Sequence, residues 1–234
     1  LKYIKMISIT LPDGSIRAFA PGTTPMEVAK NISEGFARNV ISASFEGTTI
    51  ETSTPLTTDG SLILYTWNDA EGKKAFWHST SHVMAQVLEE MFPGIQLTLG
   101  PAIANGFYYD VDFGDQKITE ADFKAIESRI LEISKEKHEF KMRAVTKAEA
   151  LETYKDNVYK TELISNLEDG TITFCDHATF TDLCRGGHIP NTSIIKAVKI
   201  MSVAGAYWRG DEKNKQLTRV YGTSFPKQKD LTEY

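Results

Sequence analysis

Two pairs of side chains that can bind a metal ion or transfer protons stand far apart in this sequence. His78 and His82 lie four residues apart in HSTSH, and Cys184 and His188 lie four residues apart in CRGGH. The chain holds only five histidines and two cysteines, so the two pairs take four of these seven residues. Imidazole and thiolate groups bind zinc, move protons near neutral pH or hold a polar substrate. Only tertiary structure can bring the pairs together into one site.

Local sequence predicts a different setting for each pair. Apolar residues at helical spacing predict a helix over residues 75–91 that ends before Pro93 and Gly94. His78 and His82 are then one turn apart on the same face. In the second pair, the two glycines of CRGGH favour a tight loop and leave room for a ligand.

Spacing alone permits a zinc site with these four residues as ligands. It does not favour a metalloprotease, because Ser79 stands where the H-E-x-x-H motif has its general-base glutamate. We interpret Cys175 as structural and favour the same role for His177, which fits either role, and we interpret His138 as a polar residue on a helix face. His138 lies in a polar helical stretch, His177 at the end of a strand, and Cys175 at a buried apolar position.

Composition indicates a globular chain of one or two domains, with 234 residues of which 41% are hydrophobic and 24% charged. No apolar run reaches membrane-spanning length, the first residues do not show the pattern of a signal peptide, and only two cysteines occur. We therefore expect a reducing, cytoplasmic location. The net charge of −5 argues against a protein that coats nucleic acid. Residues 196–219 are locally basic, which fits either a solvated turn or a phosphate contact.

The pattern of elements predicts an α+β protein. Residues 1–67 read as two strands, a helix that begins near Pro25 and two further strands, the order of a small ubiquitin-like β-grasp domain. Residues 68–225 read as a larger α+β domain, a mostly antiparallel sheet packed against helices. We expect residues 226–234 to begin a linker, and the chain to be a piece of a longer protein.

Four motifs in the same order resemble bacterial threonyl-tRNA synthetases: HSTSHVMAQVL, LGPAIANGFYYDVDF, FTDLCRGGHIPNT and AGAYWRGDEKNKQLTRVYGT. The similarity covers essentially the whole chain. It implies that residues 1–67 are the TGS domain of that family and that residues 68–225 are its editing domain. The catalytic domain would follow Tyr234, so the family's ATP, Mg and Zn are expected only there, and this fragment is expected to carry no cofactor and no metal.

The resemblance also implies a reaction and a set of residues. Editing hydrolyses the ester of seryl-tRNA(Thr), since one methyl group provides only about 1–3 kcal/mol of discrimination against serine. Water would be activated by His78 and Lys160, and the seryl ammonium would be held by Asp182, which completes the catalytic set. The remaining pocket residues implied are His82, Tyr109, Cys184 and His188.

The expected partner is tRNA(Thr), bound at its single-stranded, aminoacylated 3′ end by stacking and phosphate contacts. The basic candidates for those contacts are Arg185, Arg209, Lys213, Lys215 and Arg219. We expect this fragment to be a monomer, the full-length family a homodimer, and neither to bind a membrane. Two alternatives stay open: a free-standing, zinc-dependent aminoacyl-tRNA deacylase with these His and Cys residues as ligands, and a non-catalytic RNA-binding TGS module.

Overall fold

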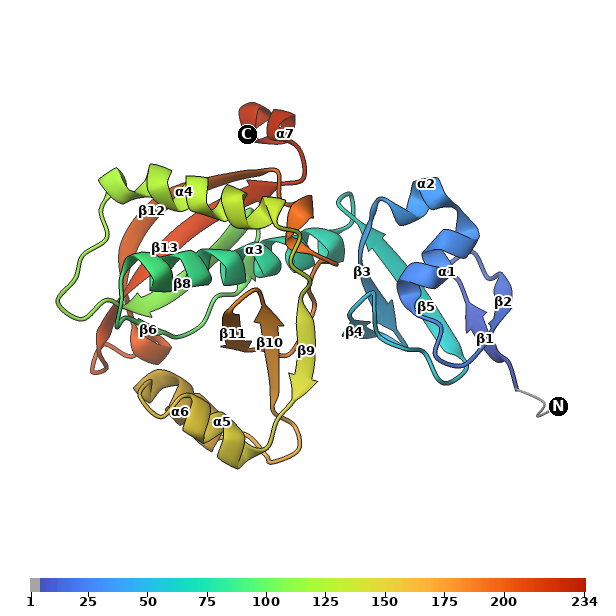
Figure 1. Cartoon of the computed structure of the whole chain (residues 1–234), viewed down its shortest axis with the longest axis horizontal. Coiled ribbons are helices and arrows are strands. Elements are labelled where there is room, and N and C mark those ends of the chain that lie inside the picture. Colours follow the sequence, from blue (N-terminus) through green and yellow to red (C-terminus); the bar gives the residue numbers. More distant parts are fainter. Residues whose placement is uncertain (1–4) are drawn as a thin grey trace. The chain divides into compact units, whose positions relative to one another are not determined.

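The computed structural model describes residues 5–234, which form an α+β protein as predicted (Figure 1). The chain divides into two compact units. One holds the residues up to Phe76 together with Gly186–Pro190, and the other holds Trp77–Arg185 and Asn191–Tyr234. Among the described residues, no helix is both long and apolar enough to cross a bilayer.

The first unit is built on a mixed five-stranded sheet. Its strands, in spatial order, are β2 (Ile16–Phe19), β1 (Ile7–Thr10), β5 (Gly60–Thr66), β3 (Val40–Phe45) and β4 (Thr48–Ile50). β1 and β5 pair in parallel, whereas the other pairs are antiparallel. This arrangement confirms the predicted β-grasp fold.

A single main helix completes the β-grasp unit. α1 (Pro25–Ile32) begins with a capping box, in which Thr24 and Glu27 bond each other's backbone, and Pro25 fixes its first turn. Val28 faces a core made with strand residues such as Ile9 and Leu62. The sequence did not predict α2 (Glu34–Ala37) or β4, because a single helical turn and a three-residue strand leave no readable periodicity.

The long helix α3 (Ala70–Met91) carries the first pair of histidines. It ends at Met91 as predicted but begins at Ala70 rather than at residue 75. The reason lies in Asp69, whose carboxylate accepts hydrogen bonds from the backbone N–H and the hydroxyl of Thr66 at 2.7 and 2.9 Å. Its own carbonyl accepts from Lys73 N, so the polar stretch read as a junction is the first helical turn.

The second unit contains two antiparallel sheets, which confirms the expected strand pairing. The larger has the order β12 (Ala197–Tyr207), β13 (Gln216–Phe225), β8 (Gly106–Asp112) and β6 (Gln96–Leu97), with β7 (Ala102–Ile103) also pairing with β8. The smaller has the order β11 (Phe180–Leu183), β10 (Thr173–His177) and β9 (Lys141–Ala144). Both sheets contribute residues to the site described below.

Helices α3 and α4 (Glu120–Lys135) run along the larger sheet of this unit (Figure 1). α3 is fixed to β13 by two bonds to Ser224: the Trp77 indole N–H donates to its carbonyl at 2.9 Å, and the Thr80 hydroxyl lies 2.8 Å from its hydroxyl. α4 packs on β12 and buries the predicted stripe of Phe123, Ile126, Ile130 and Ile133.

The remaining helices are short: α5 (Lys147–Thr153), α6 (Val158–Ser165), α7 (Gln228–Glu233) and the 3-10 turns η1 (Thr192–Ile194) and η2 (Trp208–Gly210). The side chain of Asn157 caps α6 by accepting from the backbone N–H groups of Tyr159 and Lys160. Its amide also donates to the carbonyl of Leu97 at 2.8 Å. Asn157 therefore fixes the start of α6, and with it Lys160, against β6.

The start of α3 gives a test in which helix propensity and packing disagree. An Ala side chain at Gly72 would bring Cβ within 1.9 Å of the carbonyl oxygen of Thr66. Helix propensity alone predicts that Gly72→Ala stabilises the protein by about 1 kcal/mol. We expect the clash to win and destabilise it by about 1–3 kcal/mol, measured by urea unfolding. Lys74→Ala, an exposed change on the same turn, is the control and should be nearly neutral.

Candidate functional site

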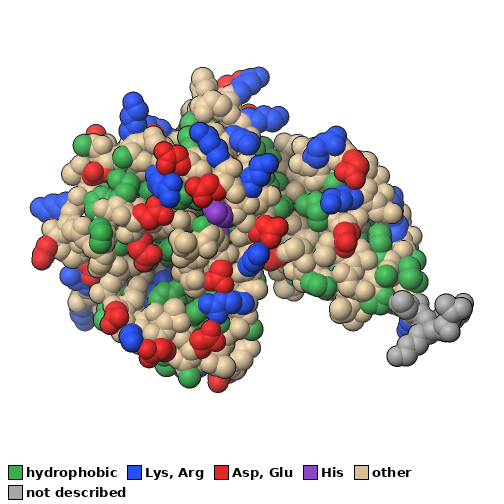
Figure 2. Space-filling model, viewed as in Figure 1, with side chains coloured by type: hydrophobic (Ala, Val, Ile, Leu, Met, Phe, Trp, Pro, Cys, Tyr) green, Lys and Arg blue, Asp and Glu red, His purple; other side chains and the backbone are tan. Residues whose placement is uncertain are grey.

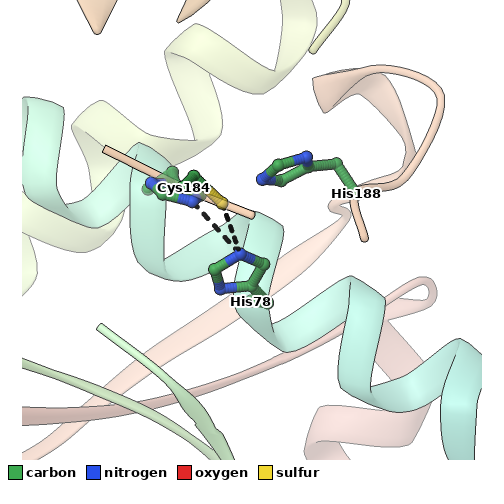
Figure 3. A group of neighbouring side chains, drawn as sticks. His78, Cys184 and His188 are labelled. Atoms are coloured by element: carbon green, nitrogen blue, oxygen red, sulfur yellow. Dashed lines mark hydrogen bonds between the residues drawn. The ribbon is translucent and has the colours of Figure 1, made fainter. Parts of the chain in front are cut away.

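Three of the four predicted side chains meet directly within the second unit. His78 Nε2 lies 3.1 Å from the sulfur of Cys184 (Figure 3). It lies 3.3 Å from Nε2 of His82. The two histidines come from successive turns of α3, and Cys184 directly follows β11. The chain therefore brings together residues about a hundred positions apart, as a shared site requires.

The fourth residue, His188, belongs to the same cluster. One ligand atom from each of His78, His82, Cys184 and His188 lies within 4.8 Å of all the others. In Figure 3 the imidazole of His188 points toward Cys184 and His78. Tetrahedral zinc with ordinary bond lengths holds its nitrogen and sulfur ligands roughly 3.3–3.6 Å apart. The two distances measured around His78 are close to that range.

Each histidine of the cluster has its Nδ1 atom directed to an acceptor. His82 Nδ1–H donates to the carboxylate of Asp182 at 2.9 Å, and His188 Nδ1–H donates to that of Glu51 at 3.0 Å. His78 Nδ1 is 3.4 Å from the carbonyl oxygen of Gly100. A proton on Nδ1 places the ring lone pair on Nε2, and this arrangement is usual for histidines that bind zinc.

The prediction that this chain carries no cofactor and no metal is therefore wrong. Nε2 of His78 and Nε2 of His82 face each other at 3.3 Å beside a sulfur atom. Two lone pairs at that distance repel unless a cation lies between them, either a proton or a metal ion. The donor set and its close approach suggest a zinc site.

A buried carboxylate, Asp182 on β11, organises the side chains next to this cluster. One of its oxygens accepts from the ammonium of Lys160 at 2.5 Å. The other accepts from Tyr109 Oη–H at 2.7 Å and from His82 at 2.9 Å. Asp182 and Lys160 are 2% and 1% exposed, so this ion pair is shielded from water.

The pKa values of these side chains reflect both their burial and the charges of their neighbours. Burial by itself raises the pKa of Asp182, but Lys160 and His82 outweigh it and hold that pKa well below the usual range. For His82, burial lowers the pKa, and the opposing effects of Cys184 and Asp182 leave a net increase. The pKa of Tyr109 lies well above its usual value, first because it is buried and then because Asp182 is anionic. Asp182 thus stays charged, whereas Tyr109 stays neutral.

A pocket of about 280 Å³ opens beside the Lys160–Asp182 pair. Besides these two residues, its lining includes Glu89 of α3, Leu97 of β6 and Tyr154, which follows α5. Burial raises the pKa of Glu89, with a further contribution from the charge of Asp182. The pocket is thus lined by both members of the ion pair.

Glycines shape the backbone on both sides of the cluster. In the predicted tight loop, Gly186 and Gly187 have φ values of +101° and +89°, in the region that favours glycine. At Gly100, a Cβ atom would lie 2.2 Å from the ring of Tyr109. That close approach places the Gly100 carbonyl where Ser81 donates to it at 2.7 Å and where His78 is also in reach.

Three of the predicted RNA contacts are in ion pairs within the protein. Arg209 pairs with Glu162 at 2.7 Å and Lys215 with Asp112 at 3.7 Å. Arg219 donates two hydrogen bonds to Asp110, at 2.7 and 2.9 Å, and its guanidinium stacks on the ring of Tyr108.

The other two predicted contacts, Arg185 and Lys213, are exposed, and no ion pair is recorded for either among residues 5–234. Trp208, the neighbour of Arg209 in the sequence, is buried at 7% exposure and donates its indole N–H to Glu162. Figure 2 shows acidic and basic side chains interspersed over the visible face.

Sequence reasoning missed Glu51, Gly100 and Glu89. Glu51 and Gly100 hold histidines of the cluster, and Glu89 lines the pocket. Gly100 lies within the motif LGPAIANGFYYDVDF, but the motif does not reveal its contact with His78. Glu51 lies alone in a polar segment after β4, and no spacing rule connects it with His188. Cys175 and His177 are buried, as a structural role requires. The helical setting expected for His138 is wrong, because α4 ends at Lys135 and His138 follows it, bonded to Glu136 at 2.6 Å.

Two family models match parts of this chain. Residues 7–66 match the TGS domain. Residues 172–221 match the second additional domain of threonyl and alanyl tRNA synthetases. The second match includes Asp182 and all five residues of CRGGH, whereas α3 with its two histidines lies before it.

Curated relatives cover nearly all of this chain. It is 90% identical over 229 residues to a protein of Flavobacterium johnsoniae named Threonine--tRNA ligase, and 85% identical to one of Flavobacterium psychrophilum with the same name. A Threonine--tRNA ligase of Parabacteroides distasonis is 56% identical over 231 residues. Each alignment covers 98% of this chain but only 35% or 36% of the relative, so the chain spans about a third of their length.

The buried ion pair predicts a large loss of stability on removal of its anion. In Asp182→Asn the ammonium of Lys160 stays buried without a counter-charge, which should cost about 3–5 kcal/mol in urea unfolding at pH 7. Asp176→Asn is the control, because it breaks a half-exposed pair with Arg143 in the same sheet and should cost at most about 1 kcal/mol. Equal losses in both variants would contradict the role given to burial.

The cluster predicts that metal-free protein binds one zinc ion. Cys184→Ser should weaken zinc binding by more than about tenfold, since even residues that only support a ligand contribute 10–100-fold. Competition with a chromogenic chelator measures the affinity, and a cobalt-substituted sample should show thiolate-to-metal absorption. Cys175→Ser, the other buried cysteine, controls for general effects of the substitution. If both cysteine variants bind zinc like the wild type, Cys184 is not a ligand.

Proposed function

Since this chain belongs to the threonyl-tRNA synthetase family and matches its amino-terminal TGS and editing region, we propose that it hydrolyses the ester of seryl-tRNA(Thr). The observation that carries the proposal is the convergence of His78, His82 and Cys184 beside a buried Lys160–Asp182 pair. Such a grouping of proton-transferring and charged side chains next to a pocket is typical of a catalytic site.

Hydrolysis of the seryl ester is needed because binding alone discriminates poorly between serine and threonine. Serine lacks one methyl group of threonine, and a missing methyl group changes binding by only about 1–3 kcal/mol. A synthetic site alone therefore passes some serine onto tRNA(Thr). A second site that hydrolyses the wrong ester raises fidelity beyond what binding can provide.

His78 has the position of a proton-transfer residue. It is the one member of the four-residue cluster that is partly exposed, whereas His82, Cys184 and His188 are buried. We assign Nε2 of His78 to accept a proton from the attacking water and to return it to the departing ribose oxygen. Its Nδ1 contact with Gly100 holds the ring in that orientation.

The three buried members are the residues that would hold zinc. A catalytic zinc site has three protein ligands and one open position, whereas four protein ligands close a structural site. When bound, zinc polarises a carbonyl oxygen and lowers the pKa of a bound water. This division of roles predicts that His78→Ala keeps zinc better than Cys184→Ser does.

Asp182 and Lys160 act through charge in this proposal. Both oxygens of Asp182 are engaged by Lys160, Tyr109 and His82, so it positions these groups rather than taking the seryl ammonium itself. The ammonium of Lys160 donates to Asp182 at 2.5 Å and therefore serves as a hydrogen-bond donor. A fixed cation in a dry site can stabilise the oxyanion that develops on the ester carbonyl.

The proposed RNA contacts concern the single-stranded 3′ end. Arg185 directly follows Cys184 and is exposed, as is Lys213. These two side chains can reach phosphates without first breaking an ion pair recorded in this structure. Arg209, Lys215 and Arg219 would have to exchange Glu162, Asp112 and Asp110 for a phosphate, at a cost in stability.

The test is deacylation of seryl-tRNA(Thr) and threonyl-tRNA(Thr) by this chain. We expect hydrolysis of the seryl ester alone, and a loss of about 10²–10⁴-fold in rate in His78→Ala. His138→Ala is the matched control, because that histidine lies at the surface beside Glu136, and it should keep the wild-type rate. If neither ester is hydrolysed while tRNA still binds, the chain is an RNA-binding module. Equal rates for both esters would contradict an editing role.

A further inference from the structure

Glu51 makes a dense set of hydrogen bonds to the loop that carries His188. Its Oε1 atom accepts from Gly187 N at 2.9 Å and from His188 Nδ1 at 3.0 Å, and its Oε2 atom accepts from His188 N at 3.1 Å. The imidazole of His188 is fully buried, and the side chain of Glu51 is 12% exposed. Three donors thus converge on one carboxylate.

The loop backbone is shaped for this contact. Gly187 has φ +89°, a conformation that disfavours other residues. In that conformation the successive N–H groups of Gly187 and His188 both reach the carboxylate. Consecutive N–H groups that converge in this way form an anion-binding concavity. Glu51 occupies it with a side chain of the protein itself.

The contact determines which nitrogen of His188 is available. A carboxylate only accepts hydrogen bonds, so the proton of a neutral His188 must reside on Nδ1. Nε2 then carries the lone pair that a metal ion or a proton donor requires. The same pattern holds at His82, where Asp182 accepts from Nδ1 at 2.9 Å. His82 and His188 therefore each donate their Nδ1–H to a carboxylate.

We propose that Glu51 is a positioning residue of the site, which fixes the tautomer and orientation of His188 and holds the Gly187–His188 backbone. Glu51 lies within the segment that matches the TGS domain, outside residues 172–221. The proposal rests on the proposed role of His188 as a site residue. Under this proposal the TGS segment contributes a site residue that lies outside the motifs HSTSH and CRGGH.

A glutamine cannot replace Glu51, although it has the same shape. A carboxylate offers two acceptor oxygens for the three donors, whereas an amide offers one oxygen and turns N–H groups toward the other donors. Glu51→Gln should therefore release His188 while it removes no volume. Glu51→Asp keeps the charge but is one methylene shorter, so it should retain only part of the effect.

The first measurement is the pair of ring ¹⁵N chemical shifts of His188 in metal-free protein, at a pH where the ring is neutral. In the wild type we expect a proton on Nδ1 and a bare Nε2. In Glu51→Gln we expect a mixture of tautomers. Glu34→Gln, an exposed glutamate of the same unit, is the matched control and should leave the shifts unchanged. Circular dichroism verifies that both variants fold.

The second measurement is zinc affinity by chelator competition. Loss of a carboxylate behind a metal-binding histidine weakens binding about 10–100-fold, so we expect that loss in Glu51→Gln, a smaller one in Glu51→Asp and none in Glu34→Gln. Unchanged ring shifts in a folded Glu51→Gln variant would overturn the proposal. If the wild type binds no zinc or hydrolyses no ester, the proposed function fails, whereas the ring shifts still decide the role of Glu51.

Discussion

The site depends on one buried charge, the carboxylate of Asp182. A carboxylate without water must find hydrogen-bond donors and a counter-charge inside the protein, because an unpaired buried charge is very costly. Asp182 finds them in Lys160, Tyr109 and His82. These come from α6, β8 and α3, so a single carboxylate requires three separate elements to meet at β11.

The hydrogen bonds to Asp182 require that Lys160 and Tyr109 be held in definite positions. Lys160 reaches Asp182 only because Asn157 holds the start of α6 against β6. Tyr109 approaches because residue 100 is a glycine, since a Cβ atom there would overlap its ring. The same glycine presents its carbonyl to His78. The contacts that satisfy the buried charge therefore also orient His82 and His78.

The sequence predicted the elements of the site better than its contacts. Helical spacing put His78 and His82 on one face of α3, and two glycines predicted the loop before His188; both predictions are confirmed. Local patterns carry that information because helix period and glycine conformation are properties of neighbouring residues. The partners of Arg209 and Arg219 are Glu162 and Asp110, far away in the sequence, and only tertiary structure reveals them.

The cofactor prediction shows how two kinds of inference can disagree. Residue spacing indicated four zinc ligands, whereas the resemblance to a family favoured a site without metal. The Nδ1 atoms of His82 and His188 are each directed to a carboxylate, and Nε2 of His82 faces Nε2 of His78 at 3.3 Å. Carboxylates behind two histidines increase the electron density on the opposite nitrogens. The lone pairs on these nitrogens repel one another, and a cation between them relieves that repulsion. A metal site of this kind is what the spacing of the four residues had indicated.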